Sequence, residues 1–168
     1  MEATTSMSDK PGGFRGRMLG EDYSHKSIEF AQRLGTLKGF GSGTPGYVEF
    51  QQRDIMRDSP YPDTLSEAQE HGWDVVLDKG TFDAISLSDE NDEQGRRVCE
   101  GYKERIELLV KRGGFFLVTS CNWSADELKA WFEGGSFTYY GAVKYPSFSF
   151  GGREGQTISS VCFMKRRS

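Results

Sequence analysis

The sequence lacks the features that mark several large classes of protein. Its longest apolar run, Phe115–Val118, is far shorter than the roughly 20 residues that a membrane-spanning helix needs. Its three cysteines form no C-x-x-C pair, so we expect reduced thiols rather than disulfides. Its two histidines, His25 and His71, have no partner at metal-ligand spacing. We therefore predict a soluble, cytoplasmic protein with no metal site and no membrane partner.

Clustered positive charge is also missing. Twenty-one Lys and Arg against 25 Asp and Glu leave a net charge of −4 over 168 residues. Proteins that bind nucleic acids usually carry a basic face, so we expect no nucleic-acid partner. The length fits a single domain, which we expect to act as a monomer. The polar residues 1–13 show no periodicity and predict a frayed N-terminus, which leaves a domain over residues 14–168.

What the chain does contain is an alternation of strand and helix patterns. Apolar residues alternate or form short runs where strands are predicted, and recur at spacings of three and four where helices are predicted. Such alternation implies right-handed crossovers and a mostly parallel α/β sheet. No helix separates the last two strands, so we expect an antiparallel hairpin at the sheet edge. The predicted strands are 15–20, 47–51, 73–77, 115–120, 137–145 and 158–164, and the predicted helices are 24–35, 95–112 and one that begins at Ser124.

Polar side chains follow four of the predicted strands. In an open parallel sheet, ligands bind outside the carboxyl ends of the strands, so these side chains are candidates for a binding site. Asp22 follows the first strand and Asp54 the second. Asp78 ends the third strand, and Asn122 and Trp123 follow the fourth.

Each candidate also has a structural interpretation. Asp22 can accept the hydroxyls of a ribose or merely cap the next helix, and the spacing favours neither. Asp54, with Ile55, can contact an adenine base, but a solvated loop carboxylate is the favoured interpretation. Asp78 can line the reacting centre or pair with neighbouring charges. Asn122 and Trp123 can line a substrate slot, or Trp123 can pack as a hydrophobic staple before the capping box that begins at Ser124.

Four segments that are typical of one enzyme family occur in this order along the chain: Gly20–Ser24 (GEDYS), Asp78–Ile85 (DKGTFDAI), Thr119–Ser124 (TSCNWS) and Phe148–Gly152 (FSFGG). Together they resemble the seven-stranded S-adenosylmethionine-dependent methyltransferases. More narrowly, they resemble the protein-lysine methyltransferases that modify translation elongation factor 1-alpha. The resemblance implies a Rossmann-like sheet with strand order 3-2-1-4-5-7-6, an antiparallel last strand, and methyl transfer from S-adenosylmethionine to a lysine of that factor.

The resemblance also implies roles for the polar residues. Asp78, Asn122 and Trp123 would lie at the reacting centre, where the lysine amine arrives. The residues implied to bind the cofactor are Asp22 at the ribose with its neighbour Tyr23, Asp54 and Ile55 at the adenine, and Asp78 at the methionine part.

The chain departs from this family at its start. The family opens with an apolar strand, a G-x-G-x-G loop and a helix, whereas only 21 residues precede Asp22. We therefore expect the first β-α unit to be missing, together with the central strand of the sheet. Strands 2 and 4 would then pair directly, or the N-terminal part would be loosely attached, and stability would be low.

Two other functions remain open at this point. The chain can be a catalytically inactive, truncated methyltransferase fragment that acts at most as a binding module. A nicotinamide-dependent enzyme that uses Asp22 for ribose is disfavoured, because no G-x-G-x-x-G precedes that residue.

Overall fold

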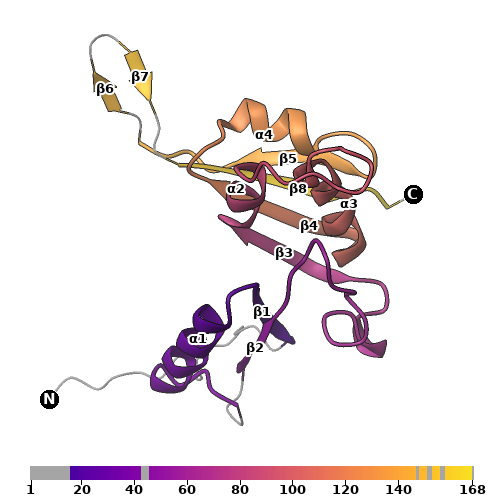
Figure 1. Cartoon of the computed structure of the whole chain (residues 1–168). Coiled ribbons are helices and arrows are strands. Elements are labelled where there is room, and N and C mark those ends of the chain that lie inside the picture. The colour runs from indigo at the N-terminus through magenta and orange to yellow at the C-terminus, as the bar shows by residue number, and fades with distance from the viewer. Residues whose placement is uncertain (1–15, 43–45, 147, 151–152, 156–157, 168) are drawn as a thin grey trace, which may run out of the picture. The chain divides into compact units, whose positions relative to one another are not determined.

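The chain is divided into two compact units, Met1–Ser59 and Pro60–Ser168. The structure is a computed structural model that describes residues 16–42, 46–146, 148–150, 153–155 and 158–167 (Figure 1). The domain predicted over 14–168 therefore comprises residues of both units. The predicted frayed segment 1–13 lies outside the described residues.

The first unit contains a strand, a helix and a second strand. β1 (Met18–Asp22) and β2 (Val48–Gln52) pair in parallel, and α1 (His25–Leu37) connects them. Ser24 caps the helix as predicted, because its Oγ accepts a hydrogen bond from the Ser27 amide at 3.4 Å. Ile28 is buried on the inner face of α1. The predicted strand–helix–strand order is confirmed here, with boundaries shifted by a few residues.

The second unit is built on a four-stranded sheet with the order β3-β4-β8-β5. β3 and β4 are parallel, and β8 is antiparallel to both of its neighbours. The antiparallel pairing expected of the last two strands is therefore confirmed. The strands are β3 (Trp73–Lys79), β4 (Val110–Ser120), β5 (Phe137–Ala142) and β8 (Ser159–Lys165), and a separate hairpin consists of β6 (Phe148–Phe150) and β7 (Arg153–Gly155). The helices are α2 (Thr81–Ser86), α3 (Tyr102–Leu109) and α4 (Ala125–Phe132), with short 3-10 turns at Glu67–Gln69 and Val98–Gly101.

The two sheets match the implied strand order on either side of its central strand. The pair β2-β1 corresponds to 3-2, and β3-β4-β8-β5 corresponds to 4-5-7-6. Within the described part of the chain, β1 and β3 belong to different sheets.

The helix predicted over 95–112 is too long at both ends. α3 begins only at Tyr102, and Val110 already pairs with Trp73 in the sheet. Gly113 and Gly114, which directly follow the predicted helix, lie inside β4, beside an irregularity in its pairing with β3. A Cβ on Gly114 would lie 2.9 Å from the carbonyl oxygens of Trp73 and Asp74. The glycine is needed for the close approach of two strands, not for the end of a helix.

Gly114→Ala is therefore expected to lower the free energy of unfolding by about 1–3 kcal/mol, because the added methyl group collides with backbone atoms. Gly141→Ala provides the matched control. Gly141 also lies in a strand, and no atom lies within 4 Å of its ideal Cβ. Chemical denaturation of both variants checks the prediction, and equal losses of stability would contradict it.

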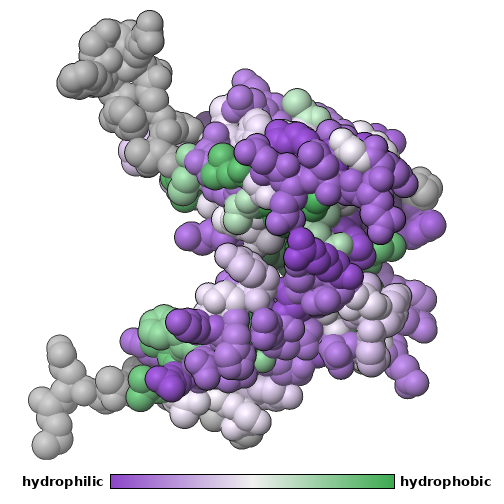
Figure 2. Space-filling model, viewed as in Figure 1, coloured by the Kyte–Doolittle hydropathy of each residue, from purple (hydrophilic) through white to green (hydrophobic). Residues whose placement is uncertain are grey.

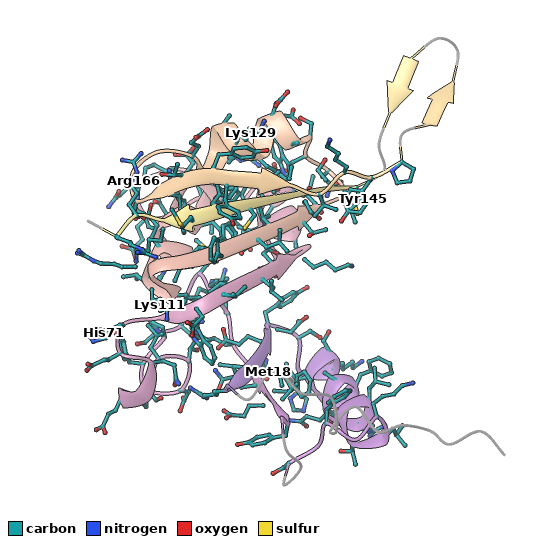
Figure 3. All side chains as sticks on the ribbon, turned by 180° about the vertical axis from the view of Figure 1, so that it is seen from behind. Met18, His71, Lys111, Lys129, Tyr145 and Arg166 are labelled. Atoms are coloured by element: carbon teal, nitrogen blue, oxygen red, sulfur yellow. The ribbon has the colours of Figure 1, made fainter. Side chains whose placement is uncertain are left out.

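Helices α2, α3 and α4 lie on one face of the four-stranded sheet, and Figure 3 shows the strands from the opposite face. An aromatic cluster lies between these helices and the sheet, with Phe132 of α4 at its centre. The ring centroid of Phe132 lies 4.9 Å from that of Phe82 in α2 and 5.1 Å from that of Phe116 in β4. All three side chains are buried, while the outer surface of the helices is mainly hydrophilic (Figure 2). This packing fixes α2, which carries much of the site described next, against the sheet.

Candidate functional site

The carboxyl ends of β3 and β4 form one edge of the second unit. The strands are parallel, and Lys79 at the end of β3 is paired with Thr119 near the end of β4. The chain leaves β3 into α2 and leaves β4 into the loop 121–123. Asp78 is therefore brought to the same edge of the sheet as the loop that carries Asn122 and Trp123, as predicted.

Asp78 organises the start of α2. Its side chain is buried, with Oδ1 accepting a hydrogen bond from the Thr81 amide at 2.9 Å and Oδ2 accepting one from the Phe82 amide at 3.1 Å. The hydroxyl of Tyr102 donates a third hydrogen bond to Oδ2 at 2.8 Å. The described partners of Asp78 are thus amides and a phenol, not the neighbouring charges considered from the sequence. Gly80 makes the turn between strand and helix, with φ of +85°.

The pKa values of this pair are shifted by their surroundings. Burial raises the pKa of Asp78, with a smaller contribution from the negative charge of Asp83, and the two together outweigh the hydrogen bonds from Tyr102, Thr81 and Phe82, which favour the charged form. Burial also raises the pKa of Tyr102 well above its ordinary value, and the adjacent carboxylate raises it further. Tyr102 therefore keeps its proton and serves as a fixed donor to Asp78.

The two predicted site residues in the loop after β4, Asn122 and Trp123, differ in how far their side chains are exposed. The side chain of Asn122 is exposed. Trp123 packs into the aromatic cluster, with its ring centroid 5.9 Å from Phe82 and 5.8 Å from Trp131. Its indole Nε1 donates a hydrogen bond to Ser86 Oγ at 2.9 Å. The packing interpretation of Trp123 is therefore supported, and the exposed side chains of this loop are those of Cys121 and Asn122.

The helix after this loop starts as the sequence predicts. Ser124 Oγ accepts a hydrogen bond from the Glu127 amide, and the Glu127 carboxylate accepts one from the Ser124 amide at 2.8 Å. The capping box is confirmed, and it ends the loop 121–123 at a defined point.

In the first unit, Asp22 and Asp54 lie at the carboxyl ends of β1 and β2. The backbone carbonyl of Asp22 accepts a hydrogen bond from the Arg53 amide at 3.0 Å. The nearly buried guanidinium of Arg53 forms an ion pair with Glu21 at 2.9 Å. These contacts tie the two strand ends together, so the predicted pair of carboxylates does occupy one edge of this sheet.

The Asp22 carboxylate has the capping function considered for it. Oδ1 accepts a hydrogen bond from the Ser24 amide at 2.7 Å and so orders the start of α1. Among the described residues no donor reaches Oδ2, which leaves an acceptor for a ribose hydroxyl. The neighbouring Tyr23 side chain is 72% exposed. Contact of Asp22 and Tyr23 with the ribose of a nucleoside cofactor stays a prediction.

Asp54 has a more local role in the structure. Its Oδ1 accepts hydrogen bonds from the amides of Met56 at 2.9 Å and Arg57 at 3.3 Å, which close a turn after β2. Ile55 is half-buried in the same turn. Contact of Asp54 and Ile55 with adenine, and convergence of both units' residues on one crevice, stay predictions.

Sequence reasoning missed three residues of this region: Asp83, Ser86 and Ser120. All three are buried polar side chains that hold the loop 121–123 to α2. Asp83 lies in the DKGTFDAI segment, Ser86 follows that segment directly and Ser120 lies in TSCNWS, but nothing in their spacing indicates that they contact one another.

The described residues contain no group of three or more His, Cys, Asp or Glu side chains that could hold a metal ion. No helix in this part of the chain is long and apolar enough to cross a membrane.

Solved structures with a similar fold include S-adenosylmethionine-dependent methyltransferases. A TehB-like methyltransferase from Corynebacterium glutamicum matches 89% of this chain and 68% of its own, with a TM-score of 0.57 and 15% identity. A methyltransferase from Methanosarcina mazei matches 89% of this chain and 82% of its own, with a TM-score of 0.57 and 13% identity. At these identities the likeness concerns the fold alone. The predicted Rossmann-like methyltransferase fold is confirmed.

Protein-lysine methyltransferases are more similar to this chain in sequence than the solved structures are. The chain is 37% identical to "Protein-lysine N-methyltransferase EFM4" of Saccharomyces cerevisiae, over 91% of this chain and 62% of that protein. It is 33% identical to "EEF1A lysine methyltransferase 2" of Homo sapiens, over 88% of this chain and 56% of that protein. No family model matches. The chain is thus a homologue of these protein-lysine methyltransferases, as its motifs predicted, and it spans a little over half of their length.

Proposed function

We propose that this protein is an S-adenosylmethionine-dependent protein-lysine N-methyltransferase that acts on translation elongation factor 1-alpha. The observation that carries the proposal is the sequence identity of 33–37% to proteins named protein-lysine N-methyltransferase or EEF1A lysine methyltransferase, which extends over about 90% of this chain. The methyltransferase fold supports the choice of cofactor, as does a structural neighbour, NodS from Bradyrhizobium japonicum, solved with S-adenosyl-L-homocysteine (TM-score 0.51). We place the protein in the cytoplasm, where translation occurs.

The residues of the chain divide into two groups in this proposal. The cofactor, when bound, supplies an electrophilic methyl group on a sulfonium centre. In the first unit, Asp22 offers its open carboxylate oxygen to the ribose beside the exposed Tyr23, with Asp54 and Ile55 proposed at the adenine. In the second unit, the proposed contacts to the incoming lysine are the exposed Asn122 and the loop around Trp123. Asp78 contributes by ordering the turn into α2 at the same strand edge.

The proposal is tested by incubating the purified protein with elongation factor 1-alpha and cofactor labelled in the methyl group. Transfer of the label to a lysine is expected. The alternative, an inactive binding module, is tested by calorimetry with the same cofactor. Absence of both transfer and heat at millimolar cofactor would refute the enzymatic proposal and favour the binding module.

Asp22→Ala is expected to weaken binding of the cofactor roughly tenfold or more, because a hydrogen bond to a charged acceptor is lost. Glu29→Ala is the matched control. Glu29 is a half-exposed carboxylate on α1, whose partner is His25 one turn away. Calorimetric titration of both variants checks the prediction. Unchanged affinity in Asp22→Ala would remove this residue from the proposed site.

A further inference from the structure

The loop after β4 is held in place by a carboxylate on α2. Asp83 Oδ2 accepts a hydrogen bond from the Cys121 amide at 2.9 Å, and Oδ1 accepts a short one from the hydroxyl of Ser120. The same Ser120 hydroxyl accepts hydrogen bonds from the amides of Asn122 at 3.0 Å and Trp123 at 2.9 Å. Asp83 thus orders three consecutive backbone amides, one directly and two through Ser120.

A second connection between α2 and this loop fixes a side chain. Ser86 lies one turn beyond Asp83 and donates its hydroxyl hydrogen to the Asp83 carbonyl at 3.1 Å. Its oxygen accepts the hydrogen bond from the Trp123 indole. Both Asp83 and Ser86 are buried. The backbone and the side chain of Trp123 are therefore both set by α2.

The chemistry of Asp83 is matched to this task. A buried carboxylate is costly unless its oxygens accept hydrogen bonds. Among the described residues Asp83 has no cationic partner, and its two oxygens are used by Ser120 and Cys121. An asparagine would offer one acceptor oxygen where two are required.

We propose that Asp83 is the positioning residue of the loop 121–123, which it holds in the conformation that presents Asn122 to the substrate. Asp83 acts through Ser120 and the backbone, and does not itself touch the substrate. The inference rests on the proposed function, in which this loop faces the incoming lysine.

Methylation kinetics test the inference in the intact protein. Asp83→Asn and Ser120→Ala are each expected to lower kcat/KM for the protein substrate roughly 10- to 100-fold, while cofactor affinity changes less than about twofold. The double variant is expected to lose little more than either single variant, because both changes break the same connection. Asp126→Asn, a change at an exposed carboxylate on α4, is the control and is expected to leave kcat/KM unchanged. Full activity of Asp83→Asn, or multiplicative losses in the double variant, would overturn the inference.

Amide hydrogen exchange separates this inference from the proposed function, because it needs no substrate. In Asp83→Asn the amides of residues 121–123 are expected to exchange at least roughly tenfold faster, whereas those of residues 116–118 inside β4 are unaffected. Faster exchange at both places would show that Asp83 serves only global stability. If the loop alone loses protection and the wild type transfers no methyl group, the proposed function fails and the positioning role stands.

Discussion

Phe132→Ala is expected to lower the free energy of unfolding of the second unit by about 3–5 kcal/mol, which is the usual cost of removing a large buried aromatic side chain. The Phe132 side chain is 1% exposed. Its ring also contacts those of Tyr102 and Phe163, at centroid distances of 6.2 and 5.8 Å. The side chain therefore joins α2 and α3 to the sheet, and no small movement of one element can fill the space it leaves.

The control for this prediction is Leu108→Ala on the neighbouring helix α3. The Leu108 side chain is 59% exposed, so its truncation is expected to change stability by less than about 0.5 kcal/mol. Urea denaturation followed by far-ultraviolet circular dichroism measures both variants. Similar losses for the two would show that the aromatic cluster is not the core of this unit.

Asp78→Ala is expected to destabilise the same unit by about 3 kcal/mol or more, because it leaves two helix amides and the Tyr102 hydroxyl buried without an acceptor. Asp126→Ala removes a carboxylate whose side chain is 93% exposed, and is expected to have little effect. A loss below 1 kcal/mol for Asp78→Ala would mean that water replaces the missing acceptor.

The pH dependence of stability provides a second measure of Asp78. Its pKa in the folded protein is raised above the ordinary value of 3.8, so the folded state holds this proton more tightly than the unfolded chain does. The contribution of this proton to stability is full below the unfolded pKa and is lost as the pH rises through the raised folded pKa, at no more than about 1.4 kcal/mol per pH unit. Asp78→Asn lacks this titration. The stability of the wild type relative to Asp78→Asn is therefore expected to fall as the pH rises, and a constant or rising difference would contradict the prediction.

Helix starts were predictable from the sequence, because each is specified by side chains within one turn. The N-cap at Ser24 and the capping box at Ser124 are examples. The polar strand ends were also predictable, because parallel strands place their carboxyl ends at one edge. These rules suffice to locate Asp22, Asp78 and Asn122 without knowledge of their partners.

Features that depend on contacts between distant segments were not predictable. The six residues of α2 are too few to show a helical period, and the helix starts at a carboxylate from the preceding strand. The extent of β4 depends on how closely Gly114 approaches Trp73. The hydrogen bond between Asp83 and Ser120 joins residues 37 positions apart. Each is determined by tertiary packing, which a local pattern does not contain.

The distribution of one residue type between the two units has an optical consequence. All three tryptophans, Trp73, Trp123 and Trp131, lie in the second unit, and two of them contact Phe82 in the aromatic cluster. Intrinsic indole emission will therefore report on the surroundings of side chains in the second unit. A tryptophan introduced in place of the exposed Phe30 on α1 would add an indole fluorophore to the first unit.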